Sequence, residues 1–196
     1  MLSKLEENIK KMEIMIKNMV CDRCKWVVAQ HLTQLGLSYQ HIELGKVYFE
    51  QMPNASQLEA LAQVLETSGF VLLTNKQSQL VEQIKTSIIL LIHQQPQLLQ
   101  KIKLSDWLAQ KLNKDFKALS QLFSEQEGIT VEQYFIVQKI ARVKEFIQYN
   151  ELSLSQIADL LHYSSVQHLS NQFKKVTGQT PSQYKENPQR KPLDFE

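Results

Sequence analysis

The sequence predicts an α+β protein, in which a small unit of strands and helices is followed by an all-helical half. Three observations carry this prediction. Between residues 13 and 75, short stretches with alternating or β-branched apolar residues surround two helical patterns. From residue 77 onward, apolar residues recur at helical spacing and strand patterns are few. One segment of the helical half also occurs twice in related form, which indicates an internal repeat.

The first unit is predicted to contain four strands and two helices. The helices end at Gly36 and Gly69, the second begins at Asn54 or Ser56, and a tight turn at Gly45 joins the two middle strands. The order strand–helix–strand–strand–helix–strand is the split-βαβ pattern. The expected elements cover residues 13–18, 24–35, 37–44, 47–50, 54–68 and 70–73.

The helical half is predicted from its caps and turns. Ser105 is expected to cap one helix, Thr130 and Gln133 to form a capping box at another, and Gly128 and Gly178 to end two more. The expected helices cover residues 80–93, about 105–112, 116–127, 131–148, about 153–161, 166–177 and a short segment from 181.

Composition narrows the class of protein. The chain has 196 residues, 43% of them hydrophobic, with five glycines and five prolines, as expected for a globular and mostly helical protein. Its longest apolar run, Ile88 to Ile92, is too short to cross a bilayer, and the first residues lack the apolar segment of a signal peptide. We therefore expect a cytoplasmic protein with no membrane partner. We expect no enzyme, because no Ser-His-Asp order, glycine-rich phosphate loop or carboxylate cluster is present in the sequence.

Charge is distributed unevenly along the chain. The net charge of +2 divides into −1 over residues 1–75 and +3 over residues 76–196. This asymmetry permits a nucleic-acid partner for the helical half without demanding one.

The internal repeat has the form helix, short polar turn, helix. The segments LSDWLAQKLNKDFKALSQLFSEQEGIT and LSLSQIADLLHYSSVQHLSNQFKKVTGQT both end in Leu-x-x-x-Phe followed by Gly-x-Thr. A helix of roughly 18 residues, about 27 Å long, lies between the copies. One turn of B-DNA is about 34 Å. Two helix-turn-helix units so spaced could enter successive major grooves on one side of a duplex.

Residues from about 79 to 186 resemble the AraC-type bacterial transcription regulators. The resemblance is carried by IADLLHYSS, by LSNQFKKVTGQTPSQYK and, more weakly, by ALSQLF, GIT and YFIVQKIARVKEFI. It implies sequence-specific binding of double-stranded DNA through two helix-turn-helix units. The glycines usual in the family's turns are replaced by Asn113 and His162, of which asparagine tolerates the left-handed conformation better.

The candidate DNA-contacting residues are the exposed positions of the second helix in each unit. The alternative is that they only keep the helix surfaces soluble. Leu119, Phe123, Leu169, Phe173, Trp107 and Ile157 are expected in the core. Lys139, Arg142, Lys144, Lys174 and Lys175 are candidates for phosphate contacts or for surface salt bridges. The predicted DNA-binding set is Lys117, Ser120, Gln121, Ser165, Gln167, Ser170, Asn171 and Lys174, together with Val166, whose role is implied by the resemblance alone.

Both cysteines of the chain lie in the stretch MVCDRC. Cys21 follows the first predicted strand, and Cys24 falls in the first turn of the next helix. A reduced pair in the cytoplasm is more typical of a metal or redox site than of a structural disulfide. The helix N-terminus and the neighbours Arg23 and Lys25 are expected to lower the thiol pKa values. Two thiolates suffice for Cu(I), whereas zinc usually needs two further ligands.

Residues 12–75 resemble the heavy-metal-associated domain, a ferredoxin-like βαββαβ fold. NMVCDRC and SGF carry the resemblance, with Asn18, Val20 and Trp26 as departures from the family pattern. It implies that Cys21 and Cys24 bind Cu(I) or another soft, thiophilic ion. The alternative is a fold reused for dimerisation or protein contact, with the thiols only packing. His31, His41 and His93 are not expected to be further ligands.

Together these features predict four segments: an N-terminal extension (1–12), a ferredoxin-like domain (13–75), a tandem helix-turn-helix domain (76–187) and a flexible tail (188–196). The main hypothesis is a DNA-binding transcription regulator with a metal-sensing, thiol-sensing or dimerisation module. A homodimer would form through the first domain. The alternative is a metal-trafficking or interaction protein whose helical half docks a protein partner.

Overall fold

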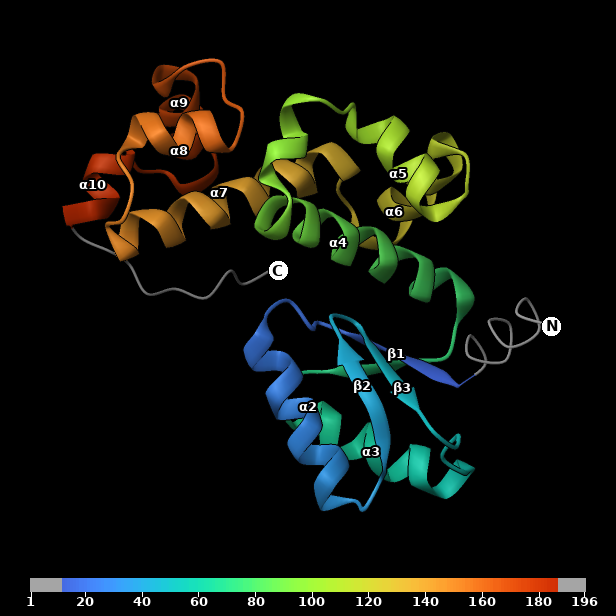
Figure 1. Ribbon diagram of the computed structural model, residues 1–196. Helices are drawn as coiled ribbons and strands as arrows, with labels where there is room; N and C mark the ends of the chain where they lie inside the picture. The colour runs from blue at the N-terminus through green and yellow to red at the C-terminus, as the bar shows by residue number, and fades with distance from the viewer. Residues whose placement is uncertain (1–11, 187–196) are drawn as a thin grey trace. The chain divides into compact units, whose positions relative to one another are not determined.

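The computed structural model describes residues 12–186 and divides into two compact units, residues 1–86 and 87–196 (Figure 1). The division lies within helix α4 (Lys76–Gln94) rather than before it. Almost all of the predicted N-terminal extension, and the whole predicted tail of residues 188–196, lie outside the described residues.

The first unit contains a four-stranded antiparallel sheet and two helices. The strand order is β2-β3-β1-β4, and every neighbouring pair is antiparallel. The sequence of strands and helices along the chain is the predicted one. The elements are β1 (Glu13–Lys17), α2 (Asp22–Gln34), β2 (Tyr39–Glu43), β3 (Lys46–Phe49), α3 (Ala55–Thr67) and β4 (Val71–Leu73).

The core of the first unit lies between one face of the sheet and the two helices. Alternate side chains of a strand point to opposite faces, so Ile14 and Ile16 share the core face of β1. Ile14 pairs with Val47 of β3, which is also fully buried. Helices α2 and α3 pack against each other and close this core. The buried side chains of the cluster are Ile14, Ile16, Met19, Val28, Leu32, Leu37, Val47, Phe49, Leu61, Leu65 and Phe70.

The opposite face of β1 carries Met15, which is also buried. The Met15 sulfur accepts a 3.6 Å hydrogen bond from the side-chain amide of Gln83, in the first half of α4. Thr86 lies so close to Gly45 that a Cβ atom added there would be 3.0 Å from the threonine hydroxyl, and Gly45 also has a φ of +78°. The first half of α4 therefore belongs to the first unit, which explains why this unit extends beyond residue 75.

The second unit is helical. Helix α6 packs against α5 and α7, while α8, α9 and α10 pack around the other part of α7 (Figure 1). None of the helices within residues 12–186 is both long and apolar enough to cross a membrane. After α4 the elements are η1 (Pro96–Gln100), α5 (Leu104–Leu112), α6 (Phe116–Glu127), α7 (Val131–Tyr149), α8 (Leu154–Leu160), α9 (Val166–Thr177) and α10 (Pro181–Glu186).

The two copies of the sequence repeat have the same local structure. The turn between α5 and α6 contains Asn113 with a φ of +50°, and the turn between α8 and α9 contains His162 with a φ of +53°. Helices α6 and α9 end at the left-handed residues Gly128 and Gly178. The predicted core residues Leu119, Phe123, Leu169, Phe173 and Ile157 are buried.

One predicted helix cap is present in the structure, whereas another predicted cap and one predicted core residue are not. Thr130 forms the predicted capping box with Gln133 at the start of α7. Ser105 does not cap α5, which begins at Leu104; its hydroxyl donates instead to the Asp106 carboxylate. Trp107 is half-buried rather than in the core, and the ammonium of Lys111 lies 4.9 Å from its ring.

Candidate nucleic-acid interface

Helix α6 exposes the first set of predicted contact residues. Asp115 caps its N-terminus by accepting a 3.1 Å hydrogen bond from the backbone of Ala118. Lys117 and Gln121 are exposed, and Ser120 is half-buried. These side chains lie in the first turns of the helix, opposite the buried Leu119 and Phe123. The Gln121 side chain donates a 2.9 Å hydrogen bond to Glu125, one turn further on.

Helix α9 exposes the second set. Ser165, Val166, Gln167, Asn171 and Lys174 are exposed, and Ser170 is half-buried. The hydroxyl of Ser165 caps the helix by accepting a 3.0 Å hydrogen bond from the backbone N–H of His168. Gln167 and Asn171 are joined side chain to side chain by a 2.8 Å hydrogen bond. The structure thus gathers this set on one side of α9, with Lys174 in the last turn and the other residues in the first two turns or at the cap.

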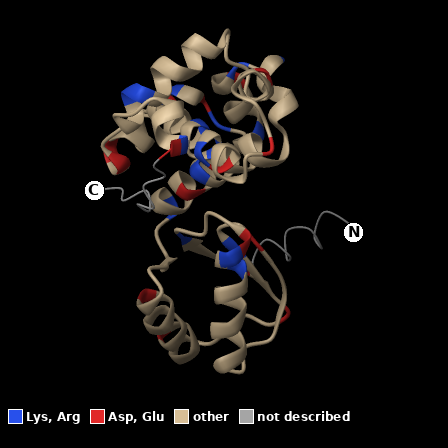
Figure 2. Ribbon diagram, turned by 90° about the vertical axis from the view of Figure 1, so that its left-hand side faces the viewer, with Lys and Arg blue, Asp and Glu red and all other residues tan. Residues whose placement is uncertain are grey.

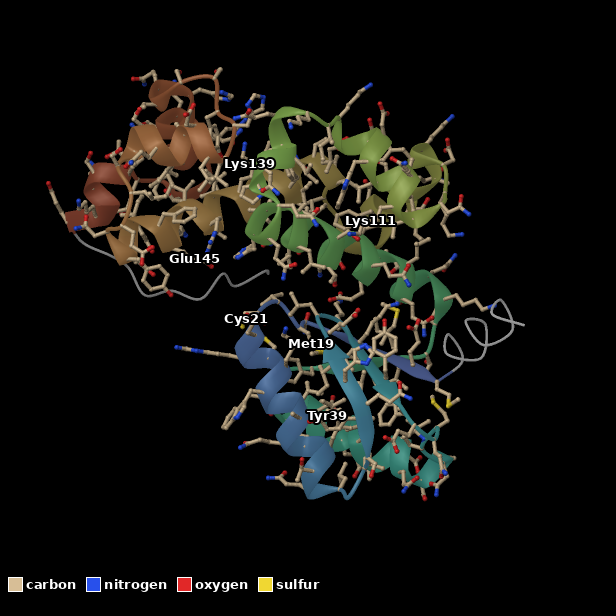
Figure 3. All side chains as sticks on the ribbon, in the orientation of Figure 1. Met19, Cys21, Tyr39, Lys111, Lys139 and Glu145 are labelled. Carbon is tan, nitrogen blue, oxygen red and sulfur yellow. The ribbon has the colours of Figure 1, made fainter. Side chains whose placement is uncertain are left out.

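Among the α7 cations predicted to contact phosphates or to form surface salt bridges, Arg142 forms a salt bridge, whereas Lys139 and Lys144 lie against aromatic rings. Lys139 (labelled in Figure 3) is 8% exposed, so the prediction that it lies at the surface is wrong. Its ammonium lies over the ring of Tyr163. Arg142 pairs with Glu145 and lies against the Phe146 ring. Lys144 lies 5.6 Å from the Tyr184 ring, and burial lowers its pKa. Lys174 and Lys175 remain exposed in the last turn of α9.

Sequence reasoning missed the contact between Lys139 and Tyr163. The ammonium nitrogen lies 3.8 Å from the ring centroid, and burial lowers the pKa of Lys139 to about 8. Tyr163 is itself buried, which raises the pKa of its phenol above its usual range. The available signal was the helical spacing of α7, which places Lys139 among the buried positions Ile140 and Val143.

The candidate interface is polar but carries little net charge. In α6, Lys117 is balanced by Glu125 and Glu127, whereas α9 carries Lys174 and Lys175 and no acidic residue. Positive and negative residues are interspersed over the helices of the second unit (Figure 2). Phosphate attraction is therefore modest, and the exposed amides and hydroxyls are the prominent groups of the two helices.

The thiol pair of the first unit lies at the N-terminus of α2. The two sulfur atoms are 3.4 Å apart and both cysteines are free. Cys21 is the exposed N-cap residue, and Cys24 is half-buried with its sulfur 3.9 Å from the carbonyl oxygen of Asn18 (Figure 3). The structure therefore brings both predicted metal ligands together, with one accessible from solvent.

The expected lowering of the thiol pKa values is wrong for Cys24. Burial raises its pKa, and this effect exceeds the opposing one of a backbone hydrogen bond from Val20. The charge of Lys25 is partly neutralised by Asp22, whose carboxylate lies 2.6 Å from the ammonium. The sequence showed the flanking cations but not the burial of the second thiol.

The loop before the thiols is held by the rest of its unit. Asn18 adopts a left-handed φ of +74°, and its side chain donates a 2.8 Å hydrogen bond to the carbonyl oxygen of Gly69. Met19 is completely buried in the core. His31 contacts Ser68, and His41 stacks on Tyr48. No group of three or more His, Cys, Asp or Glu side chains within residues 12–186 is arranged to hold a metal ion.

Comparisons with known proteins identify part of the second unit. Residues 108–187 match a family described as a helix-turn-helix domain. The "Probable transcriptional regulator LumQ" of Photobacterium leiognathi is 28% identical over 158 residues, covering 72% of this chain and 64% of LumQ. The xylose operon regulatory protein of Haemophilus influenzae is 30% identical over 69 residues, covering 35% of this chain and 18% of that protein. The chain thus spans less than two thirds of either relative.

One solved structure is also similar to this chain. The C-terminal domain of AraT, a response regulator from Geobacillus stearothermophilus, is 21% identical with a TM-score of 0.49, and the match covers 62% of this chain and 94% of that one. The match covers the end of α5 and α6 through α10, so it includes most of the first copy of the repeat and all of the second. Residues 108–187 therefore match a helix-turn-helix domain.

Proposed function

We propose that the protein is a transcription regulator that reads double-stranded DNA with helices α6 and α9. The observation that carries the proposal is the same arrangement in both repeat copies: a second helix with a buried Leu-x-x-x-Phe edge and an exposed, polar first half. In a helix-turn-helix unit these N-terminal side chains reach base edges in the major groove. The similarity to LumQ, named as a probable transcriptional regulator, and to the xylose operon regulatory protein supports the same function.

The chemistry of the exposed set suits bases more than phosphates. Glutamine and asparagine pair with the donor and acceptor of adenine in the major groove, and an apolar side chain can contact the thymine methyl group. Gln167, Asn171 and the exposed Val166 offer these groups on α9. Helix α7 has 19 residues and is therefore about 28 Å long, close to the 34 Å of one DNA turn. We therefore expect an A·T-rich site that spans two successive major grooves.

The experiment is selection of bound duplexes from random DNA, followed by fluorescence anisotropy on the recovered sequence. The variant Lys117→Glu/Asn171→Glu places negative charge on both helices and should abolish sequence-preferring binding. The control Lys76→Glu/Gln63→Glu makes the same change in charge at exposed positions of the first unit and should bind normally. Recovery of no preferred sequence, or equal binding by both variants, contradicts the proposal.

For the first unit we propose the ferredoxin-like fold of heavy-metal-associated domains, with Cys21 and Cys24 binding a soft ion such as Cu(I). The order of elements and the strand order β2-β3-β1-β4 support the fold. The two sulfurs already lie 3.4 Å apart, so Cys21 and Cys24 would supply two thiolate ligands to the same ion.

The metal proposal is tested by titrating the reduced protein with Cu(I), Zn(II) and Hg(II) and recording thiolate-to-metal absorption. The Cys21→Ser/Cys24→Ser variant is the control and should show no such band. If the wild-type chain also shows none, the thiols do not bind these ions, and a dimerisation role, measured by sedimentation of the full chain, takes its place. If the wild-type chain binds metal but selects no DNA, the metal-trafficking function is favoured over transcription regulation.

A further inference from the structure

Lys139 lies inside the helix-turn-helix domain, although lysine is seldom fully buried. Its ammonium nitrogen lies 3.8 Å from the centroid of the Tyr163 ring and 5.7 Å from that of Phe135. Within residues 12–186, no carboxylate forms an ion pair with it. The positive charge is therefore held by aromatic rings and not by an opposite charge.

A buried charge without a counter-charge opposes folding, because water solvates an ammonium far better than a protein interior does. The lowered pKa of Lys139, about 8, reflects this cost. A methionine would fill a similar space without it. Packing alone therefore does not account for a lysine at this position.

Tyr163 connects Lys139 to the candidate interface. It lies between α8 and α9, and its backbone N–H donates a 2.8 Å hydrogen bond to the carbonyl oxygen of Ala158. Its ring meets the His168 ring edge to face, with centroids 5.4 Å apart and an angle of 83°. Its hydroxyl is buried with no hydrogen-bond partner in the part of the chain that the structure describes. The ring, and not the hydroxyl, is thus the group that meets both neighbours.

His168 belongs to the exposed first turn of α9. Its Nδ1 atom lies 2.9 Å from the hydroxyl of Ser164, and its backbone N–H donates to the capping hydroxyl of Ser165. It is adjacent in the chain to Gln167, a predicted base contact. A continuous series of contacts, Lys139 to Tyr163 to His168, therefore runs from the interior of α7 to the DNA-facing turn.

We infer that Lys139 is a positioning residue for DNA binding, which orients the first turn of α9 through Tyr163 and His168. This inference rests on the proposed function. A cation over an aromatic face restricts where the ring can lie, because the attraction is greatest above the ring face. The lysine fixes Tyr163, and Tyr163 in turn limits how far the His168 end of α9 can rotate.

The test compares Lys139→Met and Lys139→Arg with the wild type on a duplex that the wild-type chain selected from random DNA of about 20 base pairs, two helical turns. Lys139→Met is expected to bind about tenfold more weakly, as for the loss of one strong cation–π contact. Its unfolding midpoint in urea at pH 7 should be higher, because a buried charge has been removed. Lys139→Arg keeps a cation over the ring and should restore most of the affinity.

Salt dependence separates positioning from direct contact with DNA. A lysine that neutralises a phosphate contributes about 0.9 to the slope of log affinity against log salt concentration. Lys139→Met should leave that slope unchanged. A slope shallower by about 0.9 would show that Lys139 reaches a phosphate in the complex, and it would overturn the inference.

If Lys139→Met does not fold, as judged by circular dichroism, two variants of Tyr163 test the positioning role instead. Tyr163→Leu removes the ring and should reproduce the loss of affinity, whereas Tyr163→Phe keeps the ring face and should bind like the wild type. Equal binding by Tyr163→Leu and Tyr163→Phe, or full affinity of a folded Lys139→Met, overturns the inference alone. A wild-type chain that selects no DNA overturns the proposed function and this inference together.

Discussion

The side-chain amide nitrogen of Gln167 donates a 2.8 Å hydrogen bond to the side-chain oxygen of Asn171, one turn further along α9. Both side chains are exposed. The bond uses the donor of Gln167 and the acceptor of Asn171. The Gln167 side-chain oxygen and the Asn171 side-chain nitrogen take no part in it. An acceptor and a donor side by side form the complement of the adenine edge in the major groove.

This pair predicts where specificity is lost in variants. Gln167→Ala and Asn171→Ala should each weaken binding to the selected duplex by about 1–3 kcal/mol, the usual discrimination of one amide–adenine contact. Each should also lose preference at one base pair, measured by binding to a set of single-base variants of the duplex. Gln126→Ala, an exposed amide late in α6, is the matched control. A loss that is uniform over all duplexes would indicate that these amides do not read bases.

The small number of cations in the predicted contact set limits the salt dependence of binding. The set contains the exposed Lys117 and Lys174, and Lys175 lies beside the latter. At about 0.9 per neutralised phosphate, the slope of log affinity against log salt should be between about −2 and −3. Lys174→Ala should reduce its magnitude by about 0.9. A wild-type slope near −6 would mean that the domain contacts phosphates through residues outside this set.

The turn residue His162 is expected to reduce stability. Its φ of +53° is left-handed, which costs a residue with a Cβ about 1 kcal/mol and costs glycine little. His162→Gly should therefore raise the unfolding free energy of the second unit by about 1 kcal/mol. The measurement is urea unfolding followed by the fluorescence of Trp107 in a Trp26→Phe background, which retains one tryptophan of the two. Asn113→Gly should give a smaller gain, because asparagine tolerates this conformation.

Lys139 predicts a dependence of stability on pH. Its pKa is about 8 in the folded protein, against an ordinary value of 10.5. Between these values the folded chain has lost the proton that the unfolded chain keeps, so the stability contributed by this residue rises with pH. The cost of the buried charge, roughly 3 kcal/mol on this shift, is complete below pH 8 and declines above it.

The same relation gives a difference measurement. The unfolding free energy of Lys139→Met should exceed that of the wild type most at pH 7, and the gap should narrow steadily as the pH approaches 10. Lys144, whose pKa burial also lowers, is present in both proteins and cancels in the comparison. A gap that does not change with pH would show that Lys139 is solvated in the folded protein.

Much of the fold follows from periodicity and end signals in the sequence. The strand and helix order of the first unit, the glycine ends at Gly128 and Gly178, and the capping box of Thr130 each depend on residues within a few positions of one another. Ser105 shows the limit of such signals. A serine near a helix start suggests a cap, yet α5 begins one residue earlier and the hydroxyl contacts Asp106 instead.

The parts of the sites that sequence did not predict depend on contacts between distant elements. The sequence predicted exposed polar residues on α6 and α9 because their spacing opposes the core leucines and phenylalanines. It placed Lys139 on the surface because of its charge, although the spacing of α7 puts it near buried positions, and the contact with Tyr163 joins α7 to the turn between α8 and α9. The pKa of Cys24 was misjudged for the same reason, because its desolvation comes from packing against the core of the first unit.

The arrangement of two reading helices joined by α7 is tested most directly by hydroxyl-radical footprinting of the full chain on its selected duplex. If α6 and α9 enter successive major grooves on one side of the DNA, two protected patches should appear on the same face, about 10 base pairs apart from centre to centre. The Lys117→Glu/Asn171→Glu variant should remove both patches. A single patch in the wild-type footprint, or two on opposite faces of the duplex, would contradict this account.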